Sequence, residues 1–287
     1  MISRIVLILA CVGLLAGCGT AGGATGKRKV VAAFYPLAFA AQEVGGSSAD
    51  VENLTPAGAE PHDIELSPQA VGRIVRADVV LYLGHGFQPA VSDAVRQSSG
   101  RAVDVLAGLP LHSAGGQEAG LTADPHVWLD PALFERIVRR IGAVLNRRAA
   151  ANALVAKLDH LDREYRAGLA HCARKDIVTS HAAFGYLAQR YRLRQVAITG
   201  LAPESEPTPR QLANVVGVVR KTHATTVFFE TLVSPRLADT VAREVGARTA
   251  VLDPIEGLTP AEQSRGDTYM TLMRRNLASL RKALACR

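Results

Sequence analysis

Short apolar runs alternate with helical patterns along residues 30–106. Runs of four or five apolar residues bounded by Pro, Gly or Asp are typical of buried strands, and apolar residues three or four apart are typical of helices. Strands are expected at 30–34, 51–55, 79–83 and 102–106, and helices begin between them at Tyr35-Pro36, Ser67-Pro68 and Pro89. Strands that alternate with helices predict a parallel sheet covered on both faces.

The second half of the chain repeats this alternation. Strands are expected at 177–179, 195–198, 226–229 and 249–252, with helices at 180–191, 209–222, 234–245 and 267–285. Between the two halves, Pro131 opens a stretch in which residues 132–172 contain no further proline and keep apolar residues at helical spacing. About 40 helical residues would span roughly 60 Å, which is longer than one small domain.

The chain is therefore expected to be an α/β protein of two lobes. Each lobe is a mostly parallel sheet flanked by helices, and one long rigid helix joins them, with room for a kink near 146–152. The boundaries are expected at 30–130 for the N-terminal lobe, 131–172 for the linking helix and 173–287 for the C-terminal lobe.

The first 29 residues have the pattern of an export signal and a tether. A basic start at Met1 to Arg4 precedes an apolar run that is too short to cross a membrane. The sequence Leu15-Ala16-Gly17-Cys18 resembles a bacterial lipobox, which implies cleavage after residue 17 and lipid on Cys18. The alternative is an ordinary signal peptide with an accidental cysteine. Residues 18–29 are rich in Gly, Ala and Thr, as flexible tethers are.

Export also bears on the remaining cysteines. Cys172 and Cys286 are the two left after Cys11 and Cys18. Two cysteines in an oxidising compartment favour one disulfide, with two unpaired thiols as the alternative.

The net charge is +7, but the basic residues are scattered with little aromatic interleaving. Such a pattern is typical of a solvated surface and contains no nucleic-acid module. We expect a monomer.

Three histidines and one aspartate occupy comparable places in the two halves. His62 follows a strand in a loop rich in Pro and Gly, and His126 lies in Asp124-Pro125-His126-Val127-Trp128-Leu129-Asp130-Pro131, just before a helix. His181 and Asp253 directly follow strands of the second half. Ligands bind beyond the carboxyl ends of parallel strands, so we expect these side chains to meet between the lobes. Three imidazoles and a carboxylate suit Zn²⁺, whereas Mg²⁺ and Ca²⁺ prefer oxygen.

The sequence resembles a known family. The resemblance rests on these segments together with Pro61-His62-Asp63, Ser180-His181-Ala182-Ala183-Phe184-Gly185-Tyr186, Glu204-Ser205-Glu206-Pro207-Thr208-Pro209 and Asp253-Pro254-Ile255-Glu256-Gly257-Leu258. The family is the zinc-receptor (ZnuA-like) branch of the metal-binding lipoproteins of ABC importers, with a TroA-like fold (solute-binding protein family 9). The resemblance runs from about Val30 to Arg287.

The resemblance implies one metal ion held between the lobes by His62, His126, His181 and Asp253. It implies delivery of that ion to an ABC importer permease and its ATPase, from a protein anchored through Cys18 to the outer face of the cytoplasmic membrane or on the periplasmic side. Manganese and iron receptors of the family usually have Glu where His181 stands. Zn²⁺ is therefore expected, with Mn²⁺ as the second candidate.

Other residues and other functions are kept as alternatives. His85 and Glu230 are candidate accessory ligands, and Glu256 is a weaker candidate. The loop at 111–123 has one His and one Glu, so a metal-collecting role is not expected for it. A zinc hydrolase could use Asp63 or Glu230 as general base. The remaining alternatives are a manganese receptor and an adhesin of the same family. We expect no enzyme activity.

Overall fold

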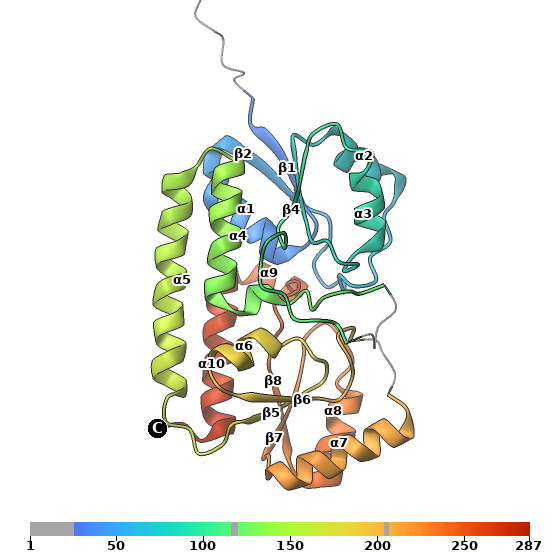
Figure 1. Ribbon diagram of the computed structural model, residues 1–287, viewed down its shortest axis with the longest axis vertical. Coiled ribbons are helices and arrows are strands. Elements are labelled where there is room, and N and C mark those ends of the chain that lie inside the picture. Colours follow the sequence, from blue (N-terminus) through green and yellow to red (C-terminus); the bar gives the residue numbers. More distant parts are fainter. Residues whose placement is uncertain (1–25, 116–119, 204–206) are drawn as a thin grey trace, which may run out of the picture.

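The computed structural model describes residues 26–115, 120–203 and 207–287 (Figure 1). The expected signal peptide, most of the tether and Cys18 lie outside the described residues, as do Glu204 and Glu206. Two parallel sheets form two lobes, one above the other in Figure 1, and helices flank both. The predicted two-lobe α/β class is therefore confirmed.

The first lobe is a four-stranded parallel sheet in the order β2-β1-β3-β4. Its strands are β1 (Arg28–Ala32), β2 (Ala49–Asn53), β3 (Val79–Tyr82) and β4 (Arg101–Asp104), and its helices are α1 (Tyr35–Gly45), η1 (Gly46–Ser48), α2 (Pro68–Arg76) and α3 (Pro89–Val95). β1 begins two residues before the expected strand, because Arg28 and Lys29 pair with Ala49 and Asp50 of β2.

The second lobe repeats the same order, β6-β5-β7-β8, again with all strands parallel. Its strands are β5 (Asp176–Thr179), β6 (Arg194–Ala197), β7 (Thr226–Phe229) and β8 (Arg248–Val251), and its helices are α6 (Gly185–Arg190), α7 (Pro209–Thr222), α8 (Arg236–Val245), α9 (Pro260–Ser264) and α10 (Tyr269–Leu284). In each sheet the chain crosses from one side of the first strand to the other, which is where such folds place their ligands.

α6 begins later than the sequence predicts, so His181 lies in a loop rather than in a first helical turn. The His181 carbonyl accepts hydrogen bonds from the Thr179 hydroxyl at 2.7 Å and from the Gln195 amide at 3.0 Å. The next N–H, that of Ala182, donates to the Gly200 carbonyl at 2.8 Å. The backbone groups of His181 and Ala182 therefore form hydrogen bonds with other parts of the fold and not with a following helical turn.

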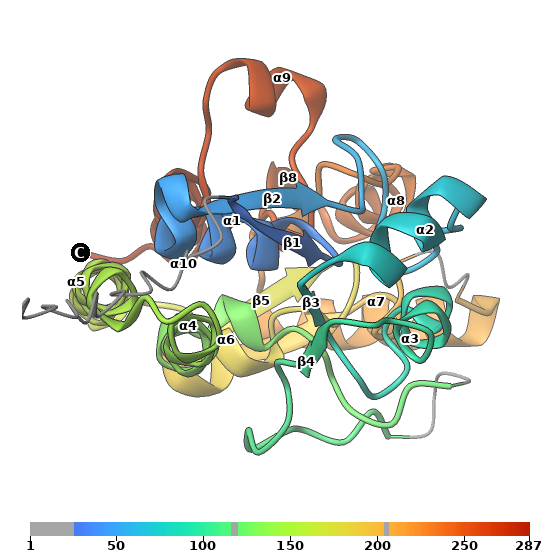
Figure 2. The ribbon, with the colours of Figure 1, turned by 90° about the horizontal axis from the view of Figure 1, so that it is seen from above.

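The expected continuous helix over 131–172 is corrected to two helices that lie side by side, α4 (Pro131–Val144) and α5 (Arg148–Leu169) (Figures 1 and 2). The chain reverses at Asn146, whose φ of 56° is left-handed. The Asn146 N–H donates to the Ala143 carbonyl and the Arg147 N–H to the Gly142 carbonyl, which is the Schellman pattern that ends helices. Asparagine tolerates this conformation better than most residues.

α5 extends along both lobes (Figure 1). Its 22 residues span about 33 Å, and it packs against α1 of the first lobe and α10 of the second. The buried Tyr165 hydroxyl donates to the Met273 carbonyl of α10 at 2.6 Å. Cys172, just beyond α5, forms a disulfide with Cys286 near the end of the chain.

A large apolar core runs through both lobes. It includes strand residues of both sheets together with Trp128, Phe134, Tyr165 and Tyr269. A smaller cluster lies under α7 and α8. Within the described part of the chain, no helix is both long enough and apolar enough to cross a membrane.

Candidate metal centre

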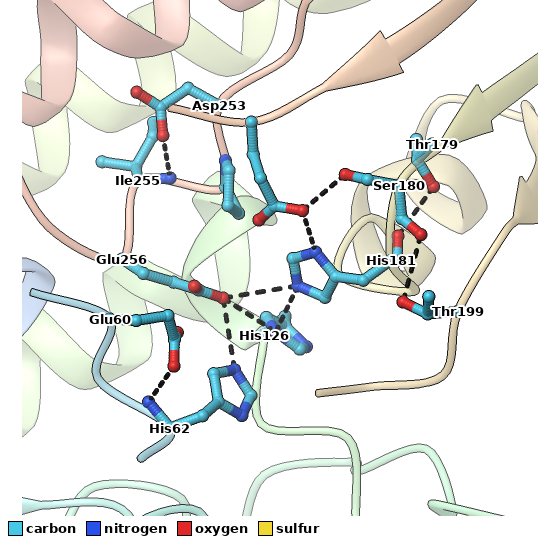
Figure 3. A network of polar contacts seen from close by, with 12 residues as sticks. Glu60, His62, His126, Thr179, Ser180, His181, Thr199, Asp253, Ile255 and Glu256 are labelled. Carbon is cyan, nitrogen blue, oxygen red and sulfur yellow. Dashed lines mark hydrogen bonds and ion pairs between the residues drawn. The ribbon is translucent and has the colours of Figure 1, made fainter. Parts of the chain in front are cut away.

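Four side chains from four separate segments point at one another between the lobes (Figure 3). His62 follows β2, and His126 comes immediately before the 3-10 helix η2 (Val127–Leu129). His181 follows β5 and Glu256 follows β8. One ligand atom from each of the four lies within 4.8 Å of all the others. The structure thus brings the three predicted histidines together.

The separations match those expected around one small ion. Glu256 Oε1 lies 3.0 Å from His126 Nε2, 3.4 Å from His62 Nε2 and 3.5 Å from His181 Nε2. The Nε2 atoms of His126 and His181 are 3.4 Å apart. Zinc–nitrogen and zinc–oxygen bonds of about 2.0–2.2 Å in a tetrahedron place neighbouring ligand atoms about 3.3–3.6 Å apart. These four distances are close to that value.

Carboxylates orient two of the imidazoles. His126 Nδ1 lies 2.7 Å from Asp124 Oδ1, which also accepts the His126 backbone N–H at 3.0 Å. His181 Nδ1 lies 2.7 Å from Glu230 Oε1, and Ser180 donates its hydroxyl to the same oxygen. A histidine that donates Nδ1–H to a carboxylate keeps the lone pair of Nε2 free for a metal.

His62 is held differently. Its backbone N–H donates to Glu60 Oε2 at 2.8 Å, and its ring meets Phe87 edge-on at a centroid distance of 4.7 Å. Gln88 donates to the Pro61 carbonyl at 3.0 Å, which fixes the residue before His62. Sequence reasoning missed Glu60, although its position two residues before a candidate ligand was a usable signal.

The fourth position differs from the sequence-based expectation, because it is Glu256 and not Asp253 that joins the group. Asp253 Oδ1 accepts the Ile255 N–H at 2.7 Å, and Asp253 Oδ2 lies 3.4 Å from the Thr231 hydroxyl. Asp253 therefore shapes the turn after β8. Ile255 has a left-handed φ of 57°, and the Pro254 carbonyl accepts the Trp128 indole N–H at 2.7 Å, which together direct Glu256 inward.

The other candidates lie outside the group of four. Glu230 contacts His181 at Nδ1, so it orients the His181 ring and is not itself in the group. His85 is exposed, and its Nδ1 lies 2.9 Å from the Thr122 hydroxyl. Asp63 is also exposed and is not in the group.

The charges of the site are strongly coupled. Burial alone would raise the pKa of Glu256, but the imidazoles, His62 foremost, hold it well below its usual value. Burial would lower the pKa of His126 and of His181, but the carboxylates that face them raise both, and that of His181 rises well above its usual value. Burial and the Glu256 charge raise the pKa of Glu60 to about 9. The metal-free site therefore favours the protonated forms of His126 and His181 beside an ionised Glu256.

Comparisons with known proteins agree with this architecture. Residues 30–283 match the model of a family described as ZnuA, zinc-uptake complex component A, periplasmic. The high-affinity zinc uptake system protein ZnuA of Bacillus subtilis is 35% identical over 98% of this chain and 97% of its own length.

A pneumococcal relative matches by sequence and by structure. The zinc-binding lipoprotein AdcA of Streptococcus pneumoniae is 34% identical over 97% of this chain, which spans 60% of that longer relative. The crystal structure of its Zn(II)-bound ZnuA-like domain covers 90% of this chain and 99% of the domain, with a TM-score of 0.76 and 35% identity.

Proposed function

Because the chain belongs to the ZnuA family of zinc-uptake components, we propose that it captures Zn²⁺ between its two lobes and passes the ion to an ABC-type importer. The observation that carries the proposal is that one ligand atom from each of His62, His126, His181 and Glu256 lies within 4.8 Å of all the others. Zn²⁺ is the cargo in this reading, and relatives named for zinc binding and zinc uptake support it.

The chemistry of the four side chains suits zinc. Three neutral imidazoles supply Nε2 lone pairs and Glu256 supplies one carboxylate oxygen, a set that Zn²⁺ accepts in tetrahedral geometry. Asp124 and Glu230 face the imidazoles from behind, so the added positive charge is balanced nearby. Mn²⁺ prefers more oxygen ligands, which makes it the second candidate.

The closed site favours a receptor over a hydrolase. A catalytic zinc keeps a coordination position for water beside three protein ligands. Here four protein groups surround one point, and His126 and His181 are fully buried. This arrangement fits the role that membership in the zinc-uptake family implies, which is that of a transport component and not an enzyme.

The decisive experiment is the metal content of natively purified protein, paired with calorimetric titration of Zn²⁺ and Mn²⁺. The wild type is expected to carry one Zn²⁺ per chain. His181→Ala should lose most of the bound zinc, and His181→Glu should lose zinc preference relative to manganese. A wild type that carries no zinc, or a zinc affinity unchanged in both variants, would contradict the proposal.

The location of the protein is a second part of the proposal. Cys18 ends a lipobox-like segment, and a relative is named a lipoprotein. We expect lipid on Cys18 to hold the receptor at the outer surface of the cytoplasmic membrane, beside its permease and ATPase. Cys18→Ala should move the protein from the membrane fraction to the soluble fraction or leave unprocessed precursor, and unchanged membrane retention would count against the anchor.

A further inference from the structure

A loop of the first lobe reaches across to a helix of the second lobe, close to the metal centre. The loop connects β4 to η2 and carries His112 and Asp124, and the helix is α6, which follows the His181 loop. The His112 ring stacks on the Tyr186 ring of α6 with centroids 4.0 Å apart and planes at 7°. His112 Nε2 also lies 2.6 Å from Gln189 Oε1, one turn further along α6.

The Tyr186 hydroxyl is the centre of this contact. It accepts the His112 backbone N–H at 2.9 Å and donates to the Asp124 carbonyl at 2.9 Å. Tyr186 is buried, and burial raises the pKa of its hydroxyl, so the hydroxyl stays protonated and able to donate. One hydroxyl of the second lobe thus fixes two backbone positions of the first lobe.

The same two positions hold a zinc ligand. The Asp124 N–H donates to the His112 carbonyl at 3.0 Å, and the Asp124 carboxylate accepts both the backbone N–H and the Nδ1–H of His126. Gly185 leaves room for this packing, because a Cβ there would lie 3.2 Å from Asp124 Oδ2. A continuous path of contacts therefore leads from α6 through Asp124 to the His126 ring.

We propose that Tyr186 is a positioning residue for His126, and that the His112–Tyr186 contact is a clasp between the lobes. While the lobes are together, the clasp fixes Asp124 and so fixes the His126 ring with Nε2 toward the ion. When the lobes separate, Asp124 loses this support and His126 loosens its hold, so zinc release is coupled to opening. This proposal rests on the proposed function, because it takes His126 as a zinc ligand.

The chain offers a matched control on the same segment. Tyr191 follows α6, is also buried, and donates its hydroxyl to Asp162 Oδ1 at 3.0 Å. Tyr186→Phe and Tyr191→Phe each delete one buried hydroxyl and keep the ring. Only the first deletion breaks the path to His126.

The test measures zinc release by competition with a chelator, together with the absorption spectrum of the Co²⁺-loaded protein. Tyr186→Phe is expected to release zinc about tenfold faster, because loss of partners that orient a ligand costs roughly 10- to 100-fold in metal affinity. Its Co²⁺ bands should also shift, since they report ligand geometry. Tyr191→Phe should match the wild type in both measurements even if both variants lose similar thermal stability. His112→Ala should follow Tyr186→Phe in the zinc release rate.

Equal release rates and equal Co²⁺ spectra for the two Tyr→Phe variants would overturn the clasp. The proposed function has a separate readout, because His126→Ala must weaken zinc binding in any receptor of this kind. If His126→Ala leaves the zinc affinity unchanged, the function fails. If His126→Ala weakens zinc and Tyr186→Phe behaves as Tyr191→Phe does, only the clasp fails.

Discussion

At the scale of residues, the site depends on groups that orient other groups. His126 and His181 each direct Nδ1 at a carboxylate and leave Nε2 facing Glu256. Asp253 takes no place in the group because its oxygens serve the turn that brings Glu256 inward. Asp253 and Glu256, three positions apart, thus have different roles, and substitutions can separate these roles.

The identity of the fourth ligand is testable by comparing two amide substitutions. Glu256→Gln keeps the size but removes the anionic oxygen, so zinc affinity should fall at least about 100-fold, the upper end of what loss of a supporting partner costs. Asp253→Asn should change the affinity far less, since its side chain lies outside the group of four. Calorimetry on both variants decides the matter. A larger loss in Asp253→Asn than in Glu256→Gln would reverse the assignment.

The pH dependence of zinc binding follows from the coupled charges. The pKa values of His126 and His181 are raised above 6.5, so protons compete with zinc at neutral pH. Zinc affinity should fall as pH decreases, starting above pH 6.5, and binding should release protons. Titration in buffers of different ionisation enthalpy measures that release. If the zinc affinity stays the same between pH 8.5 and pH 5.5, histidine ligands are excluded.

The free energy of unfolding of the metal-free protein should fall as pH rises, which is opposite to the pH dependence of the zinc affinity. Groups whose pKa is raised in the folded state stabilise it below their unfolded pKa, and this contribution is lost as pH rises through the folded pKa. Besides the two histidines, the pKa of Asp253 is raised to about 7 by burial. Urea unfolding of the metal-free protein should therefore give a lower free energy of unfolding at pH 8.5 than at pH 6.5. A rise over that range would contradict the raised values.

At the scale of elements, the hairpin of α4 and α5 connects the two lobes. α4 starts from the loop that carries His126, and α5 returns to the second lobe. The two helices approach closely at Gly142, where a Cβ would lie only 2.4 Å from the Ala151 Cβ. Glycine is needed there for packing, and Asn146 is needed for the reversal.

Gly142→Ala is therefore expected to lower the free energy of unfolding by about 1–3 kcal/mol, the usual cost of overpacking. Gly217→Ala is the matched control on α7, because a Cβ there has nothing within 4 Å. That substitution should stabilise the protein by about 0.5–1 kcal/mol through helix propensity. Urea unfolding of both variants supplies the comparison, and equal effects would refute the packing role of Gly142.

At the scale of the whole molecule, the larger core serves both lobes, and the four side chains of the candidate metal centre are not members of that apolar cluster. α5 and α10 pack together along the molecule, and Tyr165 joins them. Trp128 belongs to the core and also bonds to the Pro254 carbonyl of the second lobe. The fold should consequently persist without metal.

Removal of zinc should lower the melting temperature and leave the far-ultraviolet circular dichroism spectrum unchanged. Free zinc at 100 times its Kd should add about 2.7 kcal/mol to the free energy of unfolding, since it binds only the folded state. Calorimetric scans with and without a chelator measure the shift. Unfolding on chelation would instead indicate a structural zinc site.

The pattern along the sequence was enough to predict the two-lobe α/β class, because strand and helix periodicities are local properties of the chain. It also placed His62 and His181 after strands, where parallel sheets gather their ligands, and His126 in a loop just before a helix. A kink was expected near 146–152, but the full reversal of the chain between α4 and α5 was missed. It is a single left-handed asparagine within an otherwise helical pattern, and its effect shows only once the helices pack.

Only the tertiary structure decided the fourth member of the site. Asp253 and Glu256 are both acidic residues after the same strand, and strand-end reasoning chose the first. The choice between them depends on the left-handed backbone at Ile255 and on the Trp128 bond to Pro254 from the other lobe. The His112–Tyr186 clasp likewise joins residues 74 positions apart. Contacts between distant segments leave no local periodicity in the sequence, so folding alone sets which side chains meet.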